Sequence, residues 1–407
     1  MLIAGKNMLD KLSDTAFIIY LALLYLFEFD TANVVLTYVA FVLYAGIVCY
    51  KIVIRKQWDF GIYMAFPLLF ALFCTVSVLW ADKPADATIK VNTLWQVFLL
   101  FLLVYHDFKY REDSDFLFKC MFTAGLILTA YTLALNGFSG MLEQMEEGER
   151  LQSETTNINT IGMKLSFTAI IGLYYIIFKR KFWIIPLIIL PFIVSVATAS
   201  KKVIIMYVIA IMMFAYIKGG SNFFVKLLKI SVVVIVLLII IRQFSDIPLF
   251  YTITERFESM FAIFGDDQSQ ADASTISRNN LMMNAFEIFK RNPIVGCGIG
   301  NFGYNNAWLL GGGYVYAHNN YLELLADVGV IGTFFYYAMY GQIIFGLIKG
   351  VKNKNLPQIM MFIVFAVQII MEVALVAYYS KTTWVYLGAG YAMIAAKRSV
   401  NNAKQVN

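Results

Sequence analysis

Histidine, cysteine and charge are all scarce in this sequence. Its 407 residues include only 2 histidines and 4 cysteines, and 14% of them are charged. Soluble domains carry roughly a quarter charged residues, so the composition excludes an ordinary soluble protein. The cysteines form neither a disulfide framework nor a CxxC zinc pattern; they are Cys49, Cys74, Cys120 and Cys297.

Hydrophobic residues are abundant instead, at 60% of the chain, and the mean hydropathy is +0.71. A bilayer core of about 30 Å needs about 20 apolar residues per helix, so the apolar runs predict an all-α, polytopic membrane bundle of about twelve spans. The predicted spans are residues 15–27, 33–54, 62–80, 91–105, 117–136, 159–178, 182–199, 202–217, 223–241, 319–348, 357–378 and 382–396.

Basic residues predict the orientation of these spans. Every predicted connection on the side of the N-terminus carries Lys or Arg, whereas the acidic stretch Glu143–Glu154 lies on the other side. Cytoplasmic loops are enriched in basic residues, so both termini are predicted to be cytoplasmic. The same rule accounts for the net charge of +6, which therefore does not indicate nucleic-acid binding. No cleavage site follows the first span, and we expect that span to remain as an anchor.

The topology predicts three segments: residues 1–241 with nine spans, a large outer segment at 242–317, and residues 318–407 with three spans and a short cytoplasmic tail. Within the outer segment, Leu281, Ala285 and Phe289 recur at helical spacing, which predicts an amphipathic helix over 279–290 that Pro293 ends. This helix either lies on the bilayer surface or packs on the outer ends of the spans.

Several familiar interpretations do not fit. The two halves of the chain differ, so a transporter built from inverted repeats is not favoured. The glycines of Gly296–Gly300 imitate a dinucleotide fingerprint, but they follow a loop and not a strand, so they predict tight turns or close backbone approaches. Asp266 and Asp267 lack supporting ligands, and we expect neither a metal site nor another cofactor.

Ionisable residues gather near the predicted outer ends of several spans. His318 stands at the mouth of the tenth span, and Glu323 and Asp327 follow on one helix face. Ionisable groups within a membrane are candidates for a functional site. The predicted inner half offers no comparable cluster, which favours a site open to the outside over a permeation path. The gathered residues are Lys164, Lys201, Lys202, Arg278, His318, Glu323, Asp327, Glu372 and Lys381.

Each of these residues also has a structural interpretation. Lys201 and Lys202 can anchor a helix end at lipid headgroups. Arg278 can be an ordinary surface arginine, and Glu323 and Asp327 can pair with Lys or Arg between helices. The residue types alone leave these alternatives open.

The motifs around the cluster resemble a known family. They are Ser277-Arg278, Asn292-Pro-Ile-Val-Gly-Cys-Gly-Ile-Gly-Asn-Phe302, His318-Asn-Asn-Tyr-Leu-Glu323 and Gly329-Val-Ile-Gly332. In combination they resemble the O-antigen ligase/polymerase superfamily of bacterial membrane glycosyltransferases, which includes Wzy-type polymerases and WaaL-type ligases. Ala199-Ser200-Lys201 also fits, although the family usually has Ser-Arg there. Lysine keeps the charge at that position and loses the bidentate fork.

The resemblance implies a GT-C type helical bundle in the bacterial cytoplasmic (inner) membrane, with its active site facing the periplasm or the cell exterior. It implies a donor glycan on undecaprenyl diphosphate, transferred with inversion and without a metal. The expected partners are this lipid-linked glycan, membrane lipid, a chain-length regulator protein and a flippase.

The resemblance also implies roles for individual residues. His318 corresponds to the catalytic residue beside the acceptor hydroxyl, and Arg278 and Lys201 correspond to the groups that hold the diphosphate. Glu323 is expected to orient His318 or to define the acceptor site. The expected catalytic residues are therefore His318, Arg278 and Glu323, and the expected substrate-binding residues are Lys164, Lys201, Lys202, Arg278 and Asn319.

Three functions remain open at this point. The preferred one is a polymerase that joins lipid-linked repeat units into O-antigen, capsule or exopolysaccharide. The second is a ligase that moves a finished glycan to lipid A-core or another acceptor. The third is a transporter or flippase, which the clustering of ionisable groups on one side does not favour.

Overall fold

The protein is described by a computed structural model that covers residues 2–219 except 29, 31, 62–63 and 152–156, isolated positions between 220 and 271, and residues 272–405. All regular elements in these residues are helical, which confirms the predicted all-α class. The helices are α1 (Leu2–Phe27), α2 (Val34–Arg55), α3 (Ala65–Val76), η2 (Ser77–Trp80), α4 (Pro84–Lys109), α5 (Phe116–Asn136), α6 (Phe138–Glu146), α7 (Ile158–Lys179), η3 (Phe182–Ile184), α8 (Ile185–Ala197), α9 (Lys201–Lys218), α12 (Ala273–Arg291), α13 (Phe302–Leu310), α14 (Asn320–Lys352), α15 (Leu356–Met371) and α16 (Lys381–Gln405).

Within the described residues, five helices are long and apolar enough to cross a membrane: α2, α4, α5, α7 and α14. Three shorter apolar helical stretches are Ala65–Trp80, Phe182–Ala197 and Leu356–Met371. Each predicted span overlaps at least one helix, except the ninth, at 223–241, which lies outside the described residues apart from isolated positions. The count of twelve spans and the GT-C class stay predictions.

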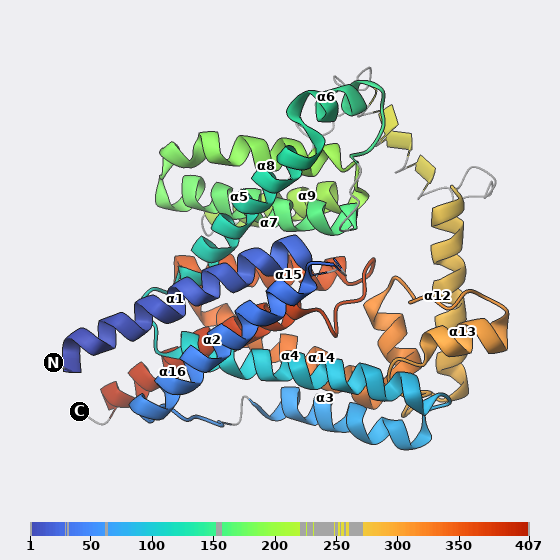
Figure 1. Cartoon of the computed structure of the whole chain (residues 1–407), viewed down its shortest axis with the longest axis horizontal. Helices are drawn as coiled ribbons and strands as arrows, with labels where there is room; N and C mark the ends of the chain where they lie inside the picture. Colours follow the sequence, from blue (N-terminus) through green and yellow to red (C-terminus); the bar gives the residue numbers. More distant parts are fainter. Residues whose placement is uncertain are drawn as a thin grey trace. The chain divides into compact units, whose positions relative to one another are not determined.

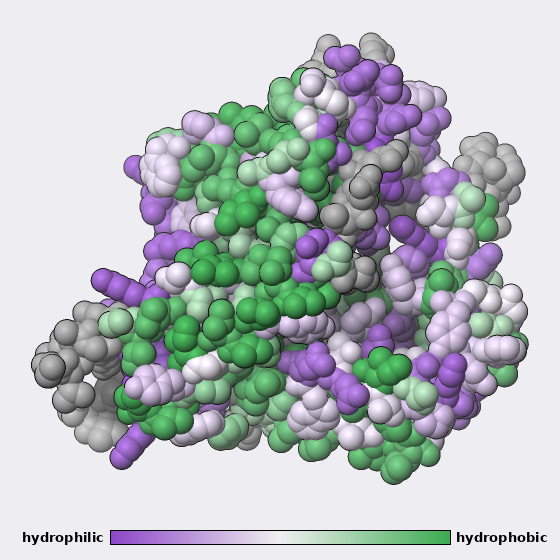
Figure 2. Space-filling view, in the orientation of Figure 1, coloured by the Kyte–Doolittle hydropathy of each residue, from purple (hydrophilic) through white to green (hydrophobic). Residues whose placement is uncertain are grey.

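The surface of α2 suits lipid better than water. Val35, Val39, Val42 and Leu43 on this helix are all more than half exposed. Figure 2 shows hydrophobic residues, in green, over broad parts of the visible surface. Contiguous apolar surface of this kind marks a membrane or interaction surface, so the fold agrees with a membrane protein.

The contacts divide the chain into two compact units, each described here by itself. Unit 1 comprises Met1–Ser13, Leu43–Ser114 and Ala273–Asn407, and unit 2 comprises Asp14–Val42 and Asp115–Asp272. The three segments expected from membrane topology stay a prediction, because packing groups the helices by contact and not by the side of the membrane.

In unit 2, α7 packs against α5, α8 and α9, the green helices of Figure 1. Small residues allow these close approaches. A Cβ on Gly125 of α5 would collide with the side chain of Thr168 on α7, and one on Gly172 of α7 would collide with Ile188 on α8.

In unit 1, α14 packs against α3, α12, α15 and α16, and α4 packs against α16 and α3. The first turn of α14, which carries the His318 motif, is therefore supported from several sides. The predicted eleventh span was too long at its C-terminal end, since α15 ends at Met371. Asn320 of α14 explains this ending: its Oδ1 accepts the backbone N–H groups of Ala377 and Tyr378, which holds that segment as a loop.

A break in α14 explains the glycine motif. Gly329 has φ 61° and ψ −166°, so the helical hydrogen bonds are interrupted there. The loop after α12 supplies the missing partners: Cys297 N–H donates to Ala326 O at 3.0 Å, and Gly298 N–H donates to Asp327 O at 2.8 Å. A Cβ on Gly296 would collide with the backbone of Asp327. The glycines therefore serve close backbone approach, as predicted, and not nucleotide binding.

A second charged cluster lies at the C-terminal end of α4, where the sequence predicted none. Lys51 Nζ binds Asp107 Oδ1 at 2.6 Å, and Arg111 binds Asp107 Oδ2 at 2.6 Å. Lys51 and Arg55 both bind Asp10 as well, at 2.9 and 2.7 Å. The expectation that charges cluster at one end only was wrong, because residues distant in sequence pair here. Each of the three cations in this cluster pairs with at least one of its two carboxylates.

Candidate functional site

His318 lies in a strained turn at the start of α14. Asn319 caps the helix, with its Oδ1 accepting the N–H of Leu322 at 3.0 Å. Glu323 reaches back, and its Oε2 accepts the backbone N–H of Ala317 at 2.7 Å. Between these two anchors His318 has φ 56°, a left-handed conformation that few residues other than glycine adopt. Strain of this kind persists only where neighbours enforce it, and it is concentrated at functional sites.

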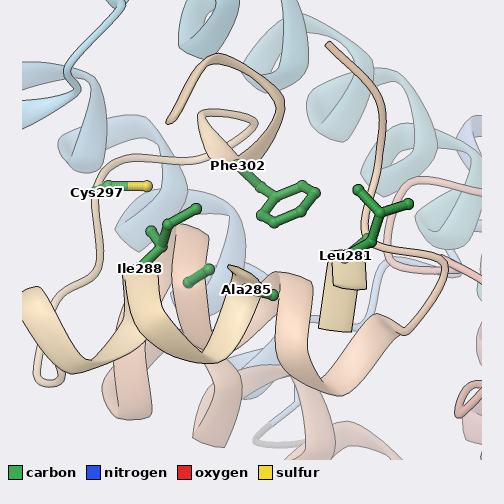
Figure 3. Packing of buried hydrophobic residues seen from close by; sticks show 7 residues of the cluster. Leu281, Ala285, Ile288, Cys297 and Phe302 are labelled. Carbon is green, nitrogen blue, oxygen red and sulfur yellow. The ribbon is translucent and has the colours of Figure 1, made fainter. Parts of the chain in front are cut away.

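Arg278 is brought to the same region by α12. The apolar face of this helix, with Leu281, Ala285 and Ile288, is buried in a cluster with Phe302 and Ala317 (Figure 3). The predicted amphipathic helix is thus confirmed, and it ends at Arg291, before Pro293. Its buried face packs on protein, which is one of the two placements that the sequence left open.

Tyr316 connects the predicted residues. Its ring centroid lies 4.1 Å from that of His318, and its phenol is within electrostatic range of Arg278 and Glu323. Burial raises the pKa of Tyr316, despite the opposing charge of Arg278. The hydroxyl therefore stays protonated near neutral pH and is able to donate a hydrogen bond.

Lys90 and Tyr379, from other parts of unit 1, lie near the group formed by Arg278, Tyr316, His318 and Glu323. Lys90 of α4 lies with its Nζ 3.5 Å from the centroid of the Tyr379 ring, and it is within electrostatic range of Glu323 and Asp327. Tyr379, in the loop before α16, is within electrostatic range of Glu323 and Tyr316. The cluster thus contains two cations, Arg278 and Lys90.

Neither cation forms an ion pair within the described part of the chain. Among the residues that the structure describes, none forms an ion pair or hydrogen bond with the guanidinium of Arg278 or the ammonium of Lys90. Both side chains are partly buried. Removing charge from water without a partner is costly, so an anion bound at this place would compensate Arg278, whereas Lys90 already lies within electrostatic range of Glu323 and Asp327.

Asp327 has a structural role in this arrangement. Its carboxylate accepts the N–H of Gly300 at 2.8 Å, the N–H of Phe302 at 2.7 Å and the hydroxyl of Tyr378 at 3.2 Å. The sequence suggested Lys or Arg partners, whereas the hydrogen-bond partners are two backbone groups and a phenol. Asp327 therefore fixes the loop before α13 against α14.

The remaining predicted residues lie in unit 2 or serve packing. Lys201 begins α9 and pairs with Asp272 at 3.5 Å, and Lys202 follows it on that helix. Lys164 is buried and pairs with Glu28 at 3.1 Å. The side chain of Asn319 is engaged as a helix cap. Substrate binding by these four residues stays a prediction that rests on the sequence.

Sequence reasoning did not identify Tyr316, Tyr379 or Lys90. Tyr316 could have been found, since it stands two residues before His318 in an exposed glycine-rich loop. Lys90 gave no such signal, because a lysine near a helix end reads as an interfacial anchor. Only the packing of α4 in unit 1 brings it to Glu323.

Comparison with known families adds independent support. Residues 186–337 match the O-antigen ligase family. The matched segment runs from α8 into α14 and includes Lys201, Arg278, His318 and Glu323. The match confirms the resemblance to the O-antigen ligase/polymerase superfamily, and it supports a membrane function of that broad type. Among curated proteins, no sequence matches this chain.

Proposed function

We propose that this protein is a membrane glycosyltransferase that polymerises oligosaccharide repeat units carried on undecaprenyl diphosphate into O-antigen, capsule or exopolysaccharide. One observation carries the proposal: Arg278, which forms no ion pair with a described residue, is within electrostatic range of Tyr316, and the Tyr316 ring contacts His318, all within the segment that matches O-antigen ligase. The protein would span the cytoplasmic membrane about twelve times, by the apolar runs of its sequence, with these residues on the outer side. It would act with a flippase and a chain-length regulator.

The donor half of the reaction needs positive charge. When the glycosidic bond to the diphosphate breaks, its electron pair remains on the phosphate oxygen, and negative charge grows there. A cation fixed beforehand at that place lowers the barrier. Arg278 suits this role because a guanidinium can form two parallel hydrogen bonds to phosphate oxygens, and no carboxylate among the described residues competes for it.

The acceptor half needs a group that handles a proton. The acceptor hydroxyl attacks the anomeric carbon from the face opposite the diphosphate, so the configuration inverts. The hydroxyl proton passes to His318, since an imidazole nitrogen is able to accept a proton as a general base. Glu323 holds the preceding backbone at Ala317 and so positions His318. No metal takes part in these steps.

A ligase that transfers the glycan to lipid A-core or another acceptor is the second candidate. It would use the same donor and the same groups, and the description of the matching family as O-antigen ligase favours it. The polymerase is preferred because polymerases of this superfamily are the more diverse group.

The test is transfer by the purified full chain in lipid nanodiscs, with undecaprenyl-diphosphate-linked repeat unit as the sole substrate. A polymerase produces a ladder of longer lipid-linked glycans on a gel. His318→Ala should produce none while remaining folded and monodisperse, and Arg291→Ala, at the exposed end of α12, should match the wild type. Product that forms only after addition of lipid A-core would make the protein a ligase and overturn the preferred function.

A further inference from the structure

An exposed row of aromatic side chains adjoins the His318 turn. Trp308 is 73% exposed, and its ring centroid lies 6.3 Å from that of Tyr304, one turn earlier on α13. Tyr314 and Tyr316, in the loop that follows, are 53% and 42% exposed. Since Tyr316 contacts the His318 ring, the row ends at the candidate site.

The row is held rigidly. Asn306 of α13 donates to Gly313 O at 2.6 Å and accepts from Asn284 of α12 at 2.7 Å, which ties the loop to two helices. Lys83 Nζ lies 5.6 Å from the Tyr304 ring centroid and 5.5 Å from that of Tyr314. This geometry is a pair of cation–π contacts, and it fixes the two rings around one ammonium group.

Two features show that this surface faces water and not hydrocarbon. Residues 311–316 are all exposed and have no regular secondary structure, so their backbone polar groups would be costly in a lipid core. The ammonium of Lys83 stands between the rings. A contiguous patch of exposed aromatic rings at such a surface marks a ligand-binding or interaction site.

We propose that Tyr304, Trp308 and Tyr314 form a sugar-binding subsite for the glycan chain that reaches His318; this inference rests on the proposed function. A pyranose ring has a face of C–H groups that packs on an aromatic face, and its hydroxyls point outward to water, to the tyrosine hydroxyls and to the Lys83 ammonium. A row of rings suits successive sugars of a chain. This subsite binds through aromatic stacking, whereas the diphosphate site needs positive charge.

The experiment measures glycan binding without catalysis. The probe is a set of lipid-free oligosaccharides, one to three repeats long, obtained by partial acid hydrolysis of the surface polysaccharide of the source cells. Binding to the full chain in nanodiscs is followed by saturation-transfer NMR. We expect Trp308→Ala to weaken binding about tenfold, since stacking on an aromatic ring contributes on the order of 1 kcal/mol or more.

Leu309→Ala is the matched control, because Leu309 is the neighbouring exposed apolar residue on the same helix. It should bind as the wild type does, and so should His318→Ala, which separates binding from turnover. In the transfer assay, Trp308→Ala should raise KM and leave kcat unchanged. Equal binding by Trp308→Ala and the wild type, or an equal loss in Leu309→Ala, would overturn the subsite.

Two further outcomes separate this inference from the alternatives. Oligosaccharide binding that depends on Trp308 in a protein without transfer activity would refute the proposed function and leave the subsite standing. Brominated phospholipid chains should not quench Trp308, as judged from the difference between the wild type and Trp308→Phe. Strong quenching would make the row a membrane anchor and overturn the subsite.

Discussion

The two ends of α4 hold cations in opposite circumstances. At its C-terminal end, Lys51 and Arg111 share the buried carboxylate of Asp107. Around its N-terminal end, Lys90 lies against an aromatic ring, and neither it nor Arg278 forms an ion pair with any described residue. Removing charge from water costs free energy at both ends of α4. At the C-terminal end direct ion pairs offset this cost, whereas at the N-terminal end Lys90 has only longer-range interactions with Glu323 and Asp327.

This difference predicts that the C-terminal cluster serves stability and that the N-terminal cluster serves activity. Paired charges at the C-terminal end hold α1, α2 and α4 together in unit 1, so their loss should reduce stability. The cations around the N-terminal end form no ion pair with a described residue, so their loss should reduce activity more than stability. Four substitutions test this division, from the largest expected effect to the smallest.

Arg278→Ala should lower glycan transfer by about 10²- to 10³-fold, the range seen when one preorganised electrostatic group is removed, with an unchanged melting temperature. The measurement is initial rate in the nanodisc assay beside thermal unfolding. Arg278→Lys keeps the charge and loses the planar guanidinium, so its transfer rate should lie between those of Arg278→Ala and the wild type. Full activity in Arg278→Ala would refute the assigned role.

Lys51→Met should destabilise the protein by about 3 kcal/mol, because it leaves Asp107 buried with one partner fewer. The readout is denaturant unfolding in detergent. The double variant Lys51→Met/Asp107→Asn should recover part of the loss, since no uncompensated charge remains. Lost transfer with unchanged unfolding would show that this cluster is functional and would break the comparison.

Lys90→Met should lower transfer about tenfold, which corresponds to roughly 1.4 kcal/mol of lost electrostatic stabilisation. Its stability should fall less than that of Lys51→Met, because Lys90 forms no ion pair among the described residues and interacts with Glu323 and Asp327 only at longer range. Lys90→Arg serves as the control and should retain most activity. A marked drop in melting temperature with normal activity would assign Lys90 to folding.

Tyr316→Phe should lower transfer by about two- to tenfold, the effect of losing one hydrogen bond, because it keeps the ring against His318 and removes only the hydroxyl. Tyr316→Ala removes the ring too and should lower transfer further. The measurement is the initial transfer rate of both variants and the wild type at saturating substrate. If both variants equal the wild type, Tyr316 does not link His318 to Arg278.

The sequence alone predicted the helices. Apolar runs of membrane length predict helices because a buried backbone must satisfy its own hydrogen bonds, and the described residues bear this out. The His318 motif could also be recognised as a candidate site, because ionisable residues within an apolar run are candidates for function; its role stays a prediction. The glycines before it correctly predicted close backbone approach.

Only the tertiary structure decided which charges are paired. Lys164 and Lys90 look alike in the sequence, as lysines near the ends of apolar runs, yet packing gives Lys164 the carboxylate of Glu28 and leaves Lys90 without an ion pair among the described residues. Asp107 and Lys51 are far apart in the chain and share one buried pair. Pairing depends on a few ångströms between side chains of different helices, and the spacing of residues along one helix carries no information about that distance.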